Sequence, residues 1–140
     1  MATNISSIFV NASRERLWNV LIQPEYVKQW QYGSELSTSW EEGTPISFRA
    51  VWNGKVMEQW GEVLEVHPLE LIKYSLFAPR PDLEDKPENY FIMHYIIEKE
   101  KGITKLQIIQ EDNRPGAVQT PEQGEENPVL KMLKELAEAV

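Results

Sequence analysis

The dipeptide Asn53-Gly54 stands between two runs of alternating apolar and polar residues, and it constrains this chain more than any other feature. In the first run the apolar side chains recur at every second position, at Ile46, Phe48, Ala50 and Trp52. The second run extends from about Val56 to Val66. Asn-Gly forms the two-residue turn whose twist matches that of antiparallel strands. The sequence therefore predicts a β-hairpin and, with it, an antiparallel sheet.

Further strands are predicted on both sides of this hairpin. They cover Ile5 to Val10, Leu71 to Ala78, Asn89 to Glu98 and Ile103 to Glu111. Lys101-Gly102 provides the turn between the last two. Gly61 interrupts the return strand of the central hairpin, and a glycine at such a position indicates a bulge or a sharp bend. The segments 79–88 and 113–126 are rich in proline and acidic residues, which favours solvated loops.

Helical signals are confined to two parts of the chain. Ser13 can cap one helix, and Pro24 suits the first turn of a second, short helix that ends at Trp30. Asn127 and Pro128 provide the same signals for a helix that extends to the chain end. The apolar stripe predicted on this last helix consists of Val129, Met132, Leu133, Leu136 and Val140.

The order of elements is strand, two helices, a run of strands, and one helix. Strands joined by short turns form antiparallel sheets, and helices segregated from the strands are typical of the α+β class. The chain has 140 residues, the usual size of one domain, and we expect residues 1–140 to form it. The sheet needs a cover for its apolar face, and the terminal helix is the natural one.

Composition excludes several classes of function. The chain has no cysteine, which excludes disulfides, thiolate metal sites and a cysteine nucleophile. His67 and His94 are the only histidines and have no metal-ligand spacing, so no metal and no cofactor is predicted. A formal net charge of −8 disfavours nucleic acid as a partner. No apolar run approaches the ~20 residues of a membrane span, and the N-terminus lacks the features of a signal peptide. We therefore expect a cytoplasmic protein.

Several segments resemble a known family. Val10-Asn11-Ala12, Leu17-Trp18, Leu21, Pro24-Glu25 and Trp30 resemble the opening of START-like (SRPBCC) domains, which have the helix-grip fold. The stretch from Gly61 to Pro68, followed by Leu71 to Tyr74, is similar to one branch, the homologues of the activator of the heat-shock protein 90 ATPase. Gly102, Thr104 and Leu106 fit its next turn.

The resemblance implies a curved antiparallel sheet wrapped around the C-terminal helix, with two short helices after the first strand. Members of the wider superfamily bind lipids, polyketides, hormones or hydrophobic metabolites, and a few act as enzymes or chaperone partners. No catalytic motif of the family can be placed on these residues, so no catalytic residue is predicted.

Aromatic residues are frequent at the predicted strand positions. A packed core explains any single one, whereas together they favour an aromatic-lined cleft for a small apolar ligand between sheet and helix. The residues predicted to line it are Trp30, Phe48, Trp60, Tyr74, Met93, Tyr95, Leu133 and Leu136.

Three ionisable residues are candidates for polar groups in this cleft: Arg49, Glu58 and His94. The alternatives are a surface ion pair between Arg49 and Glu58, and a structural role for His94. In the strand that holds His94, alignment of Gly102 with the turn of the family that the chain resembles implies that the set starting at Phe91 faces inward. The opposite set, which includes Ile92 and Ile96, would then leave an apolar outer stripe. Such a stripe indicates either a homodimer contact or coverage by another segment, and the alternative is that Ile92 and Ile96 are strand-forming residues on an exposed face.

Three functions remain open from the sequence. The first is the binding of a small hydrophobic molecule, such as a lipid. The second is a protein-interaction module with a role in stress response, resembling the chaperone ATPase activators. The third is a cyclase-like or hydrolase-like enzyme that uses the same cavity.

Overall fold

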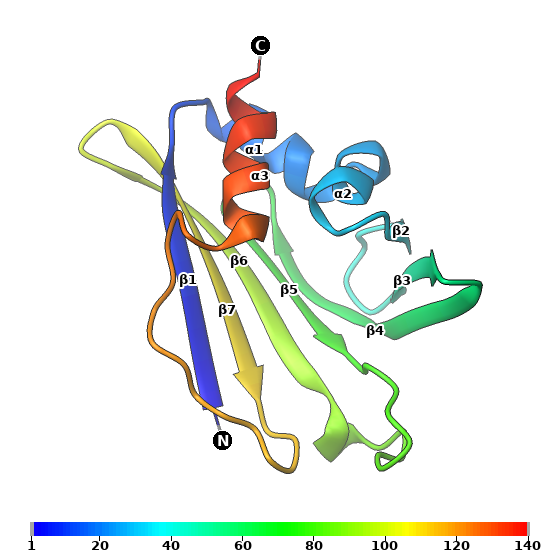
Figure 1. Cartoon of the computed structure of the whole chain (residues 1–140). Helices are drawn as coiled ribbons and strands as arrows, with labels where there is room; N and C mark the ends of the chain where they lie inside the picture. Colours follow the sequence, from blue (N-terminus) through cyan, green and yellow to red (C-terminus); the bar gives the residue numbers. More distant parts are fainter. Residues whose placement is uncertain (1, 140) are drawn as a thin grey trace.

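The computed structural model of the chain describes residues 2–139. Its elements are β1 (Ala2–Val10), α1 (Arg14–Ile22), α2 (Pro24–Trp30), β2 (Glu35–Thr38), β3 (Pro45–Trp52), β4 (Lys55–His67), β5 (Leu71–Leu76), a 3-10 turn (Pro87–Asn89), β6 (Phe91–Glu100), β7 (Ile103–Asp112) and α3 (Pro128–Glu138). The strands form one antiparallel sheet in the order β1-β7-β6-β5-β4-β3-β2. Figure 1 shows this sheet curving around α3, with α1 and α2 at one end. The predicted α+β helix-grip fold is confirmed, and β2 is the one strand that the sequence did not predict.

The two predicted hairpin turns lie where the sequence placed them. Asn53 and Gly54 have φ values of 50° and 75°, and Lys101 and Gly102 have φ values of 55° and 80°. Positive φ at both central residues defines the turn type that Asn-Gly favours. The first turn sets the register of β3 against β4, because it places Trp52 opposite Lys55.

Gly61 lies where β4 passes very close to β5. A Cβ atom built at this position would lie 1.8 Å from the backbone oxygen of Ser75, so only glycine fits without displacing the backbone. The register shift between β4 and β5 occurs further along, between Val63 and Glu65. The predicted irregularity of this strand therefore has two parts: a close approach at Gly61 and a bulge after Val63.

Helix α3 begins as predicted, because the Asn127 side chain accepts hydrogen bonds from the backbone N–H groups of Val129 and Leu130. The stripe that it buries differs from the prediction. Leu130, Leu133 and Ala137 are buried, Val129 and Leu136 are half-buried, and the Met132 side chain is 38% exposed. Val140 lies outside the described residues. Helix α3 packs against β1, α1 and α2, and this orientation turns Met132 toward solvent.

Arg16 joins the three helices at the C-terminal end of α3. Its guanidinium donates to the backbone oxygens of Leu136 and Ala139, at 2.8 and 3.1 Å, and to the Tyr26 hydroxyl at 2.9 Å. A cation next to the free carbonyls of a helix end is electrostatically favourable. This contact fixes α3 over the concave face of the sheet.

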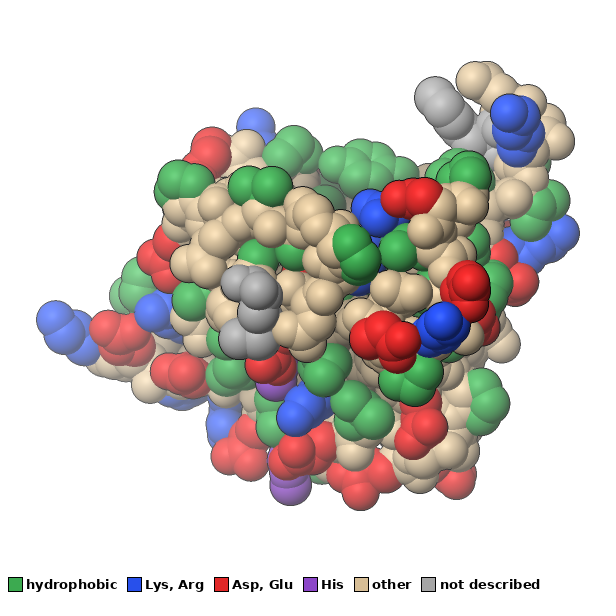
Figure 2. All heavy atoms as spheres, turned by 90° about the horizontal axis from the view of Figure 1, so that it is seen from below, with side chains coloured by type: hydrophobic (Ala, Val, Ile, Leu, Met, Phe, Trp, Pro, Cys, Tyr) green, Lys and Arg blue, Asp and Glu red, His purple; other side chains and the backbone are tan. Residues whose placement is uncertain are grey.

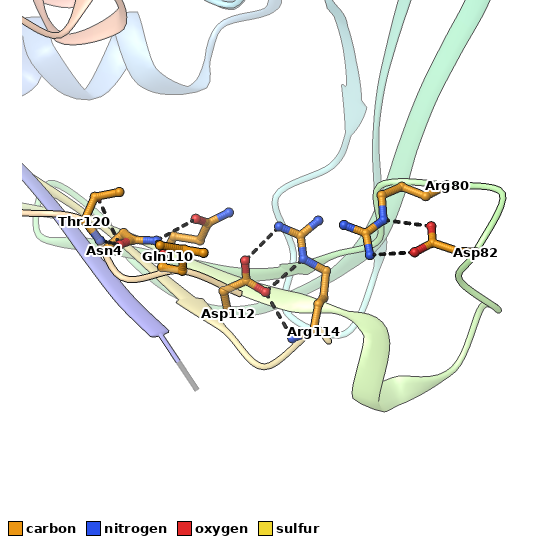
Figure 3. A network of polar contacts seen from close by, with 8 residues as sticks. Asn4, Arg80, Asp82, Gln110, Asp112, Arg114 and Thr120 are labelled. Atoms are coloured by element: carbon orange, nitrogen blue, oxygen red, sulfur yellow. Dashed lines mark hydrogen bonds and ion pairs between the residues drawn. The ribbon is translucent and has the colours of Figure 1, made fainter. Parts of the chain in front are cut away.

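The segment 113–126 was predicted to be a solvated loop, yet it covers the outer edge of β1. Backbone hydrogen bonds join Ser7 N–H to the Gln123 oxygen and Gln123 N–H to the Ile5 oxygen. Asn4 accepts from the Thr120 backbone N–H at 2.7 Å, as Figure 3 shows together with the Asp112–Arg114 ion pair at the start of the loop. An edge strand has unpaired backbone groups, and this loop pairs part of them.

Candidate ligand-binding site

Aromatic side chains fill the concave side of the sheet. Trp30 from α2 contacts Tyr95 with ring centroids 6.2 Å apart, and Tyr95 contacts Tyr74 at 5.5 Å. Phe48 and Trp40 pack on Tyr74 at 5.8 and 6.5 Å. These edge-on and tilted arrangements are the favoured geometries of aromatic pairs. The centre of the predicted cleft is thus occupied by the protein's own rings.

One polar pair lies inside this aromatic cluster. The hydroxyl groups of Tyr74 and Tyr95 are buried and 2.5 Å apart, within hydrogen-bond distance. Burial raises the pKa of Tyr95 to about 12, and burial together with the neighbouring Tyr95 raises the pKa of Tyr74 well above its usual value. Both hydroxyls therefore stay protonated at neutral pH, and each has the other as its polar partner.

The open end of the concave face holds a pocket of about 250 Å³, between the loop after α2 and the β3–β4 hairpin. Its lining includes Gln31, Tyr32, Phe48, Ala50, Met57 and Gln59. Two of these residues expose large apolar surfaces, since Met57 is 57% exposed and Tyr32 is 77% exposed. Phe48 forms the inner wall and, through its contact with Tyr74, connects the pocket with the buried rings.

Most residues predicted to line the cleft come together in the structure. Trp30, Phe48, Tyr74, Tyr95 and Leu133 are buried in one cluster, and Met93 and Leu136 pack against it half-buried. The structure thus brings these residues together, and of them only Phe48 also lines the open pocket. Whether they contact a ligand stays a prediction.

Trp60 is the exception. It lies opposite Ser47 in the hairpin register, which puts it on the face of the sheet away from the buried Ile46 and Phe48. Its indole N–H donates to Asp85 at 3.0 Å. The placement of Trp60 between sheet and helix was wrong, because the segment between β5 and β6 provides it with an apolar environment on the outer face.

The three ionisable candidates also lie away from the concave side. Arg49 and Glu58 face each other across β3 and β4 on the outer face, and both are exposed. His94 forms a hydrogen-bonded pair with Glu111 on the outer face of β6 and β7. The predicted phase of β6 is confirmed, because Phe91 and Tyr95 are buried. The prediction that Arg49, Glu58 and His94 face the cleft was wrong.

Apart from Phe48, sequence reasoning missed the residues of the open pocket. The hairpin register could have predicted two of them, because a two-residue turn at Asn53-Gly54 places Met57 opposite Ala50 and Gln59 opposite Phe48. Both pairs share the face of Phe48. Gln31 and Tyr32 follow α2 and had no such signal.

Two further observations concern metals and membranes. Within residues 2–139, no group of three or more His, Asp or Glu side chains is arranged so that it could hold a metal ion. None of the helices in that range is long and apolar enough to cross a membrane.

Comparison with known proteins identifies relatives of this fold. A family model described as Activator of Hsp90 ATPase homolog 1-like protein matches residues 11–140. The solution structure of ChR145 from Cytophaga hutchinsonii is 27% identical in sequence and has a TM-score of 0.70, and the match covers 83% of this chain and 80% of that one. No match to a curated protein was found.

Two other solved structures have the same fold at lower identity. CV1439 from Chromobacterium violaceum is 19% identical with a TM-score of 0.76, covering 97% of this chain and 96% of that one. A structure described as the Aha1 dimer from Colwellia psychrerythraea is 16% identical with a TM-score of 0.61, covering 84% and 81%.

Proposed function

The chain belongs to the family of Activator of Hsp90 ATPase homolog 1-like proteins, and from this premise we propose that it binds a small apolar molecule at the open end of its concave sheet. Members of this family and its wider superfamily often bind hydrophobic ligands. The proposed site is the pocket between the loop after α2 and the β3–β4 hairpin.

The observation that carries this proposal is the exposed apolar surface of the pocket. Phe48, Ala50 and Met57 form its apolar wall, and Gln31 and Gln59 add amide groups that can hydrogen-bond. Ligand sites combine a mostly apolar lining with a few polar groups in this way. A volume of about 250 Å³ suits a molecule of one or two rings.

The aromatic rings buried behind the pocket limit how far a ligand can enter the concave side of the sheet. Phe48 separates the pocket from the hydroxyl pair of Tyr74 and Tyr95. A ligand that leaves Phe48 in place contacts only the outer residues. A larger ligand has to displace the Phe48 ring, which costs packing with Tyr74. The site therefore favours compact ligands over long-chain lipids.

Filling the pocket tests the proposal. Ala50→Leu places a larger side chain in it, whereas Val51→Leu changes the exposed neighbour on the other face of β3. Naphthol, flavonoids, fatty acids and sterols are screened by thermal unfolding. At ~100-fold excess over its dissociation constant, a ligand stabilises the wild type by ~2.7 kcal/mol, a rise of roughly 5–12 °C.

The rise should disappear in Ala50→Leu and persist in Val51→Leu. A rise of equal size in both variants would exclude the pocket as the site. The absence of any rise across the screen would argue against small-molecule binding altogether.

A second candidate function, protein interaction, is favoured by the outer face of the sheet. Ile5 lies opposite Ile109 and Ile96 lies opposite Leu71, all of them half-buried on that face. The Colwellia psychrerythraea relative is described as a dimer. Sedimentation velocity at several concentrations distinguishes the two candidates, because self-association through this face predicts a doubled mass that Ile96→Lys abolishes. A monomeric mass throughout would exclude self-association.

We do not propose an enzyme. The cyclase or hydrolase hypothesis depended on ionisable groups in the cleft, and the three nominated residues lie on the outer face.

A further inference from the structure

The outer face of the sheet carries a groove of about 560 Å³, separate from the pocket proposed above. Its sides come from β4, from β6 and from the segment between β5 and β6. Ser75 and Ile92, which both line it, are register partners out of phase with the buried Tyr74 and Phe91. The groove therefore opens on the side of the sheet that faces away from α3.

Asp85 holds this groove together. Its carboxylate accepts a hydrogen bond from the Trp60 indole N–H at 3.0 Å and another from the Tyr90 hydroxyl at 2.6 Å. Behind these groups, Phe77 is buried between the two rings, with centroids 5.5 Å from Trp60 and 5.4 Å from Tyr90. The segment expected to be a solvated loop is in this way fixed against the sheet.

Hydrogen bonds within the segment between β5 and β6 also stabilise its conformation. Asn89 is buried, and its side-chain amide donates to the Glu84 backbone oxygen at 2.8 Å. The 3-10 turn Pro87–Asn89 then leads directly into β6. The groove wall thus rests on hydrogen bonds as well as on packing.

The groove combines aromatic and acidic groups. Glu62 and Asp85 are the ionisable carboxylates along it, and neither lysine nor arginine is among its lining residues. The phenol of Tyr90 does not add a charge at neutral pH, since burial and the neighbouring Asp85 raise its pKa. Trp60, Leu64 and Ile92 provide the apolar surface. Carboxylates next to partly exposed aromatic rings attract cations that have an apolar body.

The net charge of the whole chain favours the same sign of ligand charge. The whole chain has a formal net charge of −8. Figure 2, seen from below, shows acidic side chains interspersed with hydrophobic ones, and basic side chains between them. A negative potential raises the local concentration of cations and repels anions.

We propose that this groove binds a small organic cation, an alkylammonium or arylammonium compound. The ammonium group would lie between the carboxylates of Glu62 and Asp85, and the apolar body would pack on Trp60 and Leu64. This site is independent of the pocket on the concave side, because the two lie on opposite faces of the sheet.

Three probes of similar shape and different charge test the proposal: 2-phenylethylammonium, 2-phenylethanol and 3-phenylpropionate. Binding is followed by NMR, through the indole N–H signal of Trp60, which is assigned with a Trp60→Phe variant. The ammonium probe should give saturable shifts that weaken as salt is raised, because salt screens exposed charges. The alcohol should bind more weakly and the carboxylate least. Equal shifts with all three probes, or no saturable shift with the ammonium probe, would overturn the proposal.

Glu62→Gln removes one carboxylate without changing side-chain size, at an exposed position of β4. Glu98→Gln, at an exposed position on β6, is the matched control with the same change in net charge. Removal of the Glu62 charge should weaken binding of the ammonium probe about 3- to 10-fold. The control should leave binding unchanged. Equal affinities in the two variants would place the cation elsewhere.

Discussion

The buried pair of hydroxyls from Tyr74 and Tyr95 offers a quantitative test of the interior. Replacing either residue by Phe keeps the ring and removes one oxygen. The remaining hydroxyl is then buried among aromatic rings without its partner. An unsatisfied buried polar group costs about 1–3 kcal/mol, so each single variant should be destabilised by that amount. For a chain of this size, that lowers the melting temperature by roughly 2–13 °C.

The double variant should be much less affected than the sum of the single ones. With both hydroxyls absent, neither ring carries an unpaired polar group, and such paired replacements are nearly neutral. Urea unfolding of the wild type and of the three variants provides the four free energies of a double-mutant cycle. Because the double variant should be nearly neutral, the coupling free energy should approach the sum of the two single costs, about 2–6 kcal/mol.

The free energy of unfolding measured between about pH 10 and 12 provides a second test of this pair. The pKa of Tyr95 is raised to about 12 in the folded protein, whereas a tyrosine in the unfolded chain ionises near 10. The unfolded state therefore loses its proton first, so stability is fully present below pH 10 and falls as the pH rises toward 12. The double Phe variant should lose less stability over that interval.

Additive single variants would refute the account of this pair. The account would also be refuted if the double variant lost as much stability as the wild type when the pH is raised from about 10 to 12. Either result would mean that the two hydroxyls do not depend on each other inside the folded protein.

Three further predictions concern the fold. Gly61→Ala should destabilise the protein by at least about 3 kcal/mol in urea unfolding, because its Cβ would collide with the β5 backbone, whereas Gly124→Ala should cost under about 1 kcal/mol. Asp112→Asn should cost about 1–3 kcal/mol at neutral pH. Hydrogen bonds from Arg114 lower the pKa of Asp112 in the folded protein. The stabilisation by the Asp112 carboxylate is therefore present above the unfolded pKa of 3.8 and is lost as the pH falls below it. Asp112→Asn should accordingly lose less stability than the wild type as the pH is lowered through this range. Truncation before Asn127 removes the buried leucines of α3, each worth about 2–5 kcal/mol, and should abolish the cooperative thermal transition.

The sequence predicted the fold well where local signals agree with tertiary packing. The turns at Asn53-Gly54 and Lys101-Gly102, and the helix starts at Ser13 and Asn127, all lie as expected. Each of these signals acts through the backbone of its own segment, so it depends little on residues that are distant in sequence.

The predictions were weaker wherever a loop covers the sheet. Trp60 was expected inside because an aromatic residue on a strand usually faces the core. Its outer position depends on Asp85 and on the segment around it, which are distant in sequence. The pairing of segment 113–126 with β1 was missed for a similar reason. The composition of the segment indicated a solvated loop, and only the tertiary structure brings Gln123 beside Ile5.

The candidate site was predicted in part. The aromatic cluster of Trp30, Phe48, Tyr74 and Tyr95 follows from strand alternation, and the structure brings these rings together. Alternation does not indicate whether rings leave a cavity or fill it, because that depends on how they pack against one another. The cytoplasmic location, like ligand contact at these residues, stays a prediction.

Methionine methyl groups offer the most direct measurement of the proposed site. Met57 lies in the pocket, and Met132 is exposed on the outer side of α3. A protein labelled with ¹³C at the methionine methyls is titrated with naphthol, and Met57→Leu assigns the key signal. The account predicts a saturable shift of the Met57 signal with intermolecular NOEs to the naphthol ring, and an unchanged Met132 signal. Saturable naphthol binding that leaves the Met57 methyl unchanged, without NOEs, would contradict the proposed site.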